Sequence, residues 1–106
     1  MMFNTGAALL DAVVLAVVAK ESKGTYGYKI TQDVREVLEV SESALYPVLR
    51  RLQTSGLLET YDMEFNGRNR RYYKITSAGK KELATYRNDW LSYTKKISSM
   101  LIGGEE

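Results

Sequence analysis

The hydrophobic pattern of this chain changes its period at Gly56, and this change limits the folds that the sequence can adopt. Before Gly56 the apolar residues recur at steps of three and four, as on one face of a helix. After it, Tyr61, Met63 and Phe65 alternate with polar residues, as in a strand. Helical spacing returns after Thr76 and continues almost to the end of the chain. The sequence therefore predicts a mainly α fold with a small β-hairpin (α+β) and one long final helix.

Two different patterns predict the first two helices. From Gly6 to Lys20 nearly every residue is Ala, Leu or Val, so a helix here must be buried on several sides. After a polar break, Thr25 is the expected N-cap of the second helix. The apolar positions of this helix form one stripe: Ile30, Val34, Val37 and Leu38.

A third helix is predicted between a serine cap and Gly56. Ser41 or Ser43 can serve as its N-cap. Gly56 can adopt the left-handed backbone conformation that is common just after the end of a helix. Pro47 lacks a backbone donor, which costs least in the first turn, so Pro47 favours a helix that begins late. If the apolar stripe of this helix faces the core, its polar side chains face outward, and they offer hydroxyls, an amide and two guanidiniums. The stripe is Leu45, Val48, Leu49 and Leu52, and the outward and flanking positions are Ser43, Tyr46, Pro47, Arg50, Arg51, Gln53 and Thr54.

The predicted hairpin has a four-residue turn at 66–69, and it begins the most basic stretch of the chain. Between Phe65 and Lys81 there are six basic residues and no acidic one, although the net charge of the chain is only +2. Such a patch can neutralise phosphates of a nucleic acid. The alternative is a solvated turn whose charges discourage aggregation.

Two helices joined by a short turn and followed by a basic hairpin are the parts of a winged helix-turn-helix. Four segments of this chain, in the same order, resemble the PadR family of transcriptional regulators. They are YGYKI at 26–30, SALYPVLRRL at 43–52, GLL at 56–58 and RRYYKIT at 70–76. The resemblance implies a repressor with a winged helix-turn-helix over residues 1–76 and a dimerisation helix over 77–102. This single C-terminal helix is similar to that of the smaller PadR-like subfamily.

The resemblance also implies which residues face DNA. They are Tyr28 and Lys29 in the second helix, Ser43, Tyr46 and Arg50 in the third, and Arg68, Asn69, Arg70 and Arg71 in the wing. Arg51, on the flank of the third helix, is added because its guanidinium can reach the same surface. Guanidinium forks fit phosphates and guanine edges, so the arginines have the strongest chemical case. An aromatic residue such as Tyr46 is as often a packing residue.

The last helix carries an apolar seam that a chain of this length cannot cover fully. The seam is Leu83, Tyr86, Trp90, Tyr93, Ile97 and Met100 or Leu101. Pairing with the apolar first helix of a second copy would bury both surfaces, so the sequence predicts a homodimer. A twofold dimer would bind an inverted-repeat operator in double-stranded DNA. The alternative is that the seam folds back on its own domain.

An aromatic cluster in this helix is the expected effector site. Multidrug-binding members of the resembled family stack planar aromatic ligands on a tryptophan here, and Trp90 falls at the matching position, near Tyr86 and Tyr93. The alternative is that Trp90 only packs at the dimer seam. Arg87, one turn earlier, departs from the apolar residue expected at a drug-binding surface.

The composition closes off most enzyme classes, because the chain contains neither His nor Cys. A Cys/His zinc site, a thiol nucleophile and any His-dependent catalytic arrangement are excluded. Asp62 and Glu64 share a strand face, but no nucleophile or phosphate loop accompanies them. We therefore expect no enzymatic activity, metal or cofactor, and the alternative function is a protein-interaction adaptor.

The apolar run at 12–19 is shorter than the roughly 20 residues that span a bilayer. It also lacks the basic start of a secretory signal. A cytoplasmic location without a membrane partner is therefore expected.

Overall fold

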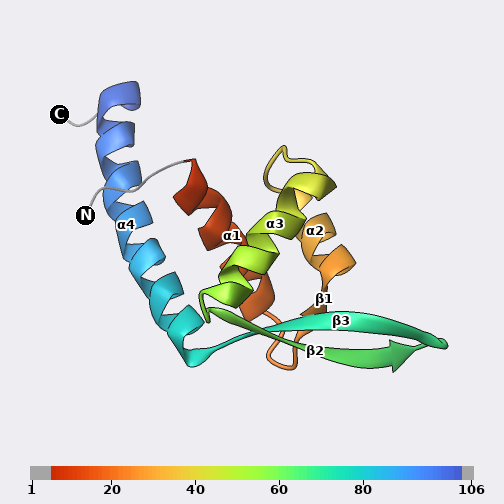
Figure 1. The fold of residues 1–106 in the computed structure, drawn as a ribbon. Helices are drawn as coiled ribbons and strands as arrows, with labels where there is room; N and C mark the ends of the chain where they lie inside the picture. The colour runs from red at the N-terminus through yellow and green to blue at the C-terminus, as the bar shows by residue number, and fades with distance from the viewer. Residues whose placement is uncertain (1–5, 104–106) are drawn as a thin grey trace.

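The computed structural model describes residues 6–103, which form helices around one face of a three-stranded sheet (Figure 1). The helices are α1 (Ala7–Ala19), α2 (Gly27–Arg35), α3 (Glu42–Thr54) and α4 (Ser77–Ile102), and the strands are β1 (Thr25–Tyr26), β2 (Leu58–Phe65) and β3 (Arg68–Ile75). The predicted mainly α fold with a hairpin and a long final helix is confirmed. Residues 1–5 of the expected DNA-binding unit lie outside the described part of the chain.

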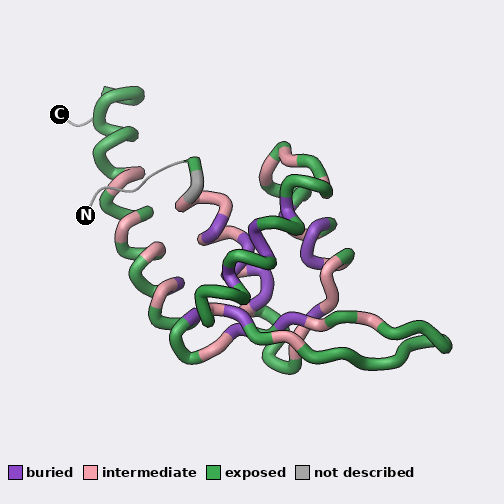
Figure 2. The backbone as a smooth tube through the Cα atoms, viewed as in Figure 1, coloured by how far each residue is buried: buried purple, intermediate pink, exposed green. Residues whose placement is uncertain are grey.

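The central helix is α1, as its apolar sequence predicts. It contacts the other three helices and β3. Val14, Leu15 and Val18 are fully buried, and they pack with Ile30 and Val34 of α2 in the core. Figure 2 shows this buried centre, with the outer half of the hairpin and the end of α4 exposed around it.

The start of α2 differs from the prediction. Thr25 is not its N-cap, because Thr25 and Tyr26 form β1 and pair antiparallel with Tyr73 and Tyr72 of β3. Tyr26 is the N-cap and makes no side-chain cap hydrogen bond. The helix also ends at Arg35, so Val37 lies beyond it and is exposed, contrary to its predicted place in the apolar stripe.

The predicted end of α3 is confirmed, whereas its start is earlier than Pro47 suggested. The side chain of Ser41 accepts a hydrogen bond from the backbone N–H of Ala44, so the helix begins at Glu42. Pro47 consequently lies in the second turn, and the carbonyl of Ser43 loses its usual helical partner. Both residues are exposed, so water can satisfy that carbonyl. At the other end, Gly56 has a φ of 82° and the helix closes there.

The hairpin has a two-residue turn, so the predicted four-residue turn is wrong. Asn66 and Gly67 have φ values of 54° and 76°, which are typical of the type I′ turn whose twist matches that of the flanking strands. Strand pairing therefore extends to Phe65 opposite Arg68. Because β3 begins at Arg68, the four residues 68–71 alternate between the two faces of the sheet and do not form a single cluster.

The long helix α4 begins after Thr76, where helical spacing was predicted to return, and the side chain of Thr76 accepts a hydrogen bond from the backbone N–H of Gly79. Its first turns pack on α1, where Leu83 is buried. Its last turns project beyond the other elements, and Met100 and Leu101 are each 81% exposed (Figures 1 and 2). No helix within residues 6–103 is both long and apolar enough to cross a membrane.

Candidate nucleic-acid interface

A cleft of about 440 Å³ lies where the start of α2, the middle of α3 and the strand β3 meet. Its lining residues are Tyr26, Gly27, Tyr28, Tyr46, Arg70, Arg71 and Tyr73. The lining consists of tyrosines, one glycine and two arginines, and it includes no acidic residue. The cleft is therefore suited to a group that is negatively charged and accepts hydrogen bonds.

Tyr46 and Tyr28 bring the two helices together at this cleft. The ring of Tyr46 packs on Gly27, where an added Cβ would lie 3.3 Å from the ring. Tyr46 is nevertheless 38% exposed, and Tyr28 is 56% exposed. Partial burial, followed by the charge of Glu42, raises the pKa of Tyr46 above its usual value. Tyr46 thus both packs and offers a neutral hydroxyl to solvent.

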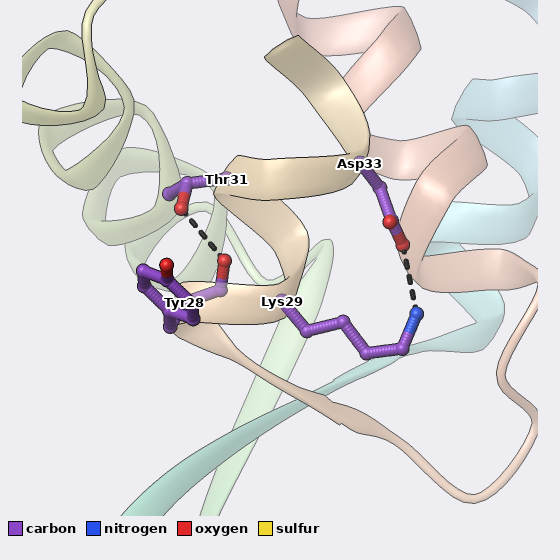
Figure 3. Close-up of polar contacts among 4 residues, drawn as sticks. All are labelled: Tyr28, Lys29, Thr31 and Asp33. Carbon is purple, nitrogen blue, oxygen red and sulfur yellow. Dashed lines mark hydrogen bonds and ion pairs between the residues drawn. The ribbon is translucent and has the colours of Figure 1, made fainter. Parts of the chain in front are cut away.

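Lys29 follows Tyr28 in the sequence but points to a different side of α2 (Figure 3). Its Nζ lies 3.1 Å from Oδ2 of Asp33, and this hydrogen bond and charge raise the pKa of Lys29. Lys29 and Asp33 line a separate hollow between α1 and α2. The hydroxyl of Thr31 donates to the carbonyl of Tyr28 on the other side of the same helix. The structure therefore brings Tyr28 to the cleft and leaves Lys29 outside it.

The two arginines of α3 have different environments. Arg50 is exposed and forms no ion pair with any described residue. Arg51 donates two hydrogen bonds, of 2.9 and 2.7 Å, to the carboxylate of Asp11 in α1. Asp11 is only 6% exposed, and a buried carboxylate requires such a partner. Arg51 thus ties α3 to α1, whereas Arg50 and the exposed Ser43 remain on the outward face.

The wing residues differ in the same way, because strand alternation separates them. Arg68 and Arg70 share one face, and Asn69 and Arg71 share the other. Arg71 lies 3.4 Å from Asp62 across the hairpin, in an ion pair that is exposed on both sides. Exposed pairs of this kind contribute little to stability, so Arg71 can exchange Asp62 for another anion at small cost.

Asp11, the partner of Arg51, was not predicted from the sequence. Asp11 is the only charged residue between Gly6 and Ala19, a position where a charge must be buried. That isolation was the available signal for an ion pair. The partner itself could not be predicted, because the residues meet only through the packing of α1 on α3.

An apolar groove of about 230 Å³ separates α1 from α4. It is lined by Leu9, Ala12, Val13, Ala16, Leu83, Tyr86, Arg87 and Trp90. Two of the three expected effector residues, Tyr86 and Trp90, are therefore brought together here. Tyr93 is not in the lining, although its ring centroid lies 6.1 Å from that of Trp90. Burial and the negative charge of Asp11 raise the pKa of Tyr86.

Comparison with known proteins matches this chain to one family of transcriptional regulators. Residues 14–85 match the family model described as "Transcriptional regulator PadR-like family". The chain is 33% identical over 81 residues to transcriptional regulator Rv3488 of Mycobacterium tuberculosis, covering 76% of this chain and 72% of that protein.

Two solved structures extend the similarity to the whole fold. The structure of smu.1704 from Streptococcus mutans has a TM-score of 0.85 at 35% identity, covering 100% of this chain and 98% of that one. A PadR-like transcriptional regulator from Bacillus cereus has a TM-score of 0.81 at 27% identity, covering 95% and 98% of the two chains.

Proposed function

This chain belongs to the PadR-like family of transcriptional regulators, and we propose that it binds an inverted-repeat operator in double-stranded DNA as a homodimeric repressor. As a member of that family it is a transcriptional regulator and not an enzyme. The proposed action is occupation of the operator, in the cytoplasm. The domains predicted from the sequence take the corresponding roles, with residues 1–76 binding DNA and 77–102 pairing the two copies.

The observation that carries the DNA-binding proposal is the cleft shared by α2, α3 and the wing, which is lined by phenols and guanidiniums without a carboxylate. In a winged helix-turn-helix the second helix of the motif enters the major groove, and here that helix is α3. Phosphates beside it would contact the cleft. The proposed DNA contacts are Tyr28, Ser43, Tyr46, Arg50, Arg68, Asn69, Arg70 and Arg71. Lys29 and Arg51 are left out because Asp33 and Asp11 engage them.

Apolar exposure on α4 supports the dimer. Trp90 is 42% exposed, and Ile97, Met100 and Leu101 of the same seam are exposed as well. Such a row on a projecting helix is unfavourable in water and is buried when a second copy packs on it. Leu83 and Tyr86 already pack against the core of their own chain, so the alternative that the seam folds back applies to the start of α4. The proposed intermolecular contact begins near Trp90.

The groove between α1 and α4 supports a response to a small planar aromatic effector. Its walls are apolar except for Tyr86 and Arg87, and the indole of Trp90 forms one side of it. The groove adjoins the proposed dimer contact. A ligand bound there would therefore act on the spacing of the two α3 helices and release the operator if it favoured the other spacing.

Selection of bound sequences from a pool of random duplex DNA tests the function. We expect an inverted repeat whose half-sites lie about one helical turn, 34–36 Å, apart. Affinity for the selected duplex should fall linearly with the logarithm of salt concentration. If no sequence is enriched and no salt-dependent duplex binding is measured, the protein is better explained as a protein-interaction adaptor with the same fold.

A further inference from the structure

The guanidinium of Arg70 is held by two aromatic rings from the neighbouring strands. Its Cζ lies 4.4 Å from the ring centroid of Tyr26 in β1 and 4.2 Å from that of Phe65 at the end of β2. Both distances are within the range of a cation–π contact. Arg70 forms no ion pair with the described residues, and it is the only half-buried arginine of the wing.

The ring of Tyr26 is itself fixed to the body of the protein. It contacts Tyr72 edge-on, with centroids 5.8 Å apart, and Tyr72 stacks on Tyr61 with centroids 5.4 Å apart. The hydroxyl of Tyr61 donates to the carbonyl of Lys23, in the loop before β1. A continuous aromatic row therefore runs along the solvent face of the sheet from that loop to Arg70.

Holding a guanidinium in this way prepares it to bind an anion. An exposed arginine loses rotamer freedom when it binds a phosphate, and this entropy loss weakens the complex. The two rings restrict Arg70 before any partner arrives. Because a cation–π contact draws on the charge of the guanidinium, its N–H donors remain for a phosphate oxygen. Both Arg70 and Tyr26 line the cleft described above, so the donors are held at its edge.

We propose that Tyr26 and Phe65 are positioning residues that hold the guanidinium of Arg70 in place to donate to a phosphate of the DNA backbone. This inference rests on the proposed DNA-binding function. It gives Phe65, an exposed apolar residue near the wing tip, a role that requires no contact between its ring and DNA. Tyr26 lies far from Phe65 and Arg70 in the sequence, and only the pairing of the strands brings the three side chains together. No local sequence motif therefore indicates the arrangement.

The test measures affinity for one selected operator duplex with three variants. Phe65→Leu removes the ring and keeps an apolar side chain, and we expect binding to weaken about 2- to 10-fold. Phe65→Tyr restores a ring and should bind like the wild type. Met63→Leu is the matched control, because Met63 lies directly opposite Arg70 in the hairpin and is exposed to a similar degree as Phe65. Unchanged affinity in Phe65→Leu would overturn the inference.

Two further readouts separate positioning from other roles of Phe65. The dependence of affinity on salt should be the same in Phe65→Leu as in the wild type, because the charge of Arg70 is still present. In an Arg70→Ala background, Phe65→Leu should cause no further loss, since it acts only through Arg70. A loss that persists in that background would show instead that Phe65 contacts DNA itself or stabilises the wing.

The contact of Tyr26 and Phe65 with the guanidinium of Arg70 is here called the clamp. A measurement on the free protein distinguishes failure of the clamp from failure of the proposed function. Nitrogen relaxation at Nε of Arg70 should report an ordered side chain in the wild type and a mobile one in Phe65→Leu. Arg68, on the same strand face, is the internal reference for a mobile arginine. Equal mobility of Arg68 and Arg70 in the wild type would exclude the clamp. Absence of duplex binding by an ordered wild type would instead reject the DNA-binding function, and the phosphate-positioning role with it.

Discussion

At the residue scale, charge alone does not identify a DNA contact in this protein, and the partner of each basic side chain is more informative. Arg51 and Lys29 lie near the proposed interface in sequence but are engaged by Asp11 and Asp33. Arg50, Arg68 and Arg70 form no ion pair with the described residues. The sequence and its family resemblance predicted all five as DNA contacts, with the strongest case for Arg50 and the wing arginines. Neither contains information on which carboxylates the fold brings beside Lys29 and Arg51.

Arg50→Ala and Arg70→Ala should weaken DNA binding in two different ways. Loss of a base contact at Arg50, on the outward face of α3, should reduce discrimination between operator and altered operators by about 1–3 kcal/mol. Loss of a phosphate contact at Arg70 should weaken binding to all duplexes alike and lower the salt slope by about one unit. Binding titrations at several salt concentrations, on operator and scrambled duplexes, measure both effects.

Lys29→Gln is the control for these variants. It removes a positive charge that is paired with Asp33 and lies outside the cleft, so its effect on the salt slope should be small. Should Lys29→Gln reduce the slope as much as Arg70→Ala does, general electrostatic attraction would explain the binding better than the proposed contacts.

At the scale of the elements, the sequence predicted each long segment and missed the contacts that depend on pairing. The apolar run of α1 and the helical periods of α3 and α4 span many residues, so they are visible without a partner. The two residues of β1 have no period, and their strand exists only because Tyr72 and Tyr73 of β3 lie beside them. The hairpin turn was predicted too long for a related reason, since Arg68 is polar and became a strand residue only through its pairing with Phe65.

The position of the cleft could be predicted only in part. The motif order indicated that α3 and the hairpin share a surface, and Tyr28, Tyr46 and Arg70 do meet there. The contribution of Tyr26 could not be foreseen, because it depends on the aromatic row along the sheet. The cross-strand partner of each wing arginine depends on the turn length, because the two-residue turn pairs Phe65 with Arg68, whereas a four-residue turn would pair Phe65 with Arg70.

The contact between α1 and α3 leads to a stability prediction. Arg51→Ala should leave the carboxylate of Asp11 buried without its partner and lower the free energy of unfolding by about 1–3 kcal/mol. The estimate is modest because the side chain of Arg51 is about half exposed. Removing both side chains, in Asp11→Ala with Arg51→Ala, should destabilise less than the sum of the single changes. Urea unfolding at one fixed protein concentration gives the four values required.

Additive losses in that cycle would contradict a direct role for the ion pair. Arg50→Ala is the matched control, because it removes the neighbouring guanidinium from the exposed face of the same helix. It should leave the free energy of unfolding nearly unchanged.

At the scale of the whole molecule, the extended shape leaves the last turns of α4 exposed beyond the other described elements, and a second copy could bury them. The principal extents are 60 × 27 × 20 Å, and the end of α4 projects from the remaining elements (Figure 1). We expect light scattering to give about twice the chain mass of 12.0 kDa at micromolar concentration. Ile97→Glu places a charge on the apolar row and should shift the mass toward that of one chain.

Ser92→Glu is the control for the dimer prediction, since helical geometry puts Ser92 on the side of α4 opposite the seam. It adds the same charge to the same exposed helix and should leave the mass doubled. A wild-type protein that is folded and monomeric at these concentrations would contradict the intermolecular role of α4.

The groove between α1 and α4 gives the last prediction, which concerns regulation. Trp90 is the only tryptophan of the chain and forms one wall of that groove, so its fluorescence reports on ligands there without interference. A small planar aromatic compound that stacks on the indole should quench or shift this emission. Arg87 also lines the groove, so neutral and anionic compounds should bind more tightly than cationic ones of the same shape.

Operator binding measured in parallel decides whether such a ligand regulates the protein. A ligand changes operator affinity only by the ratio of its affinities for the free and the DNA-bound dimer, and DNA must change ligand affinity by the same factor. Titrating the compound with and without operator duplex therefore measures the coupling twice, by independent observables. Trp90→Ala should remove the effect of the compound on operator binding, and Leu91→Ala, outside the groove lining, is its control for loss of an apolar side chain. Constant emission across neutral, anionic and cationic compounds would contradict the effector site and favour a packing role for Trp90 at the dimer seam.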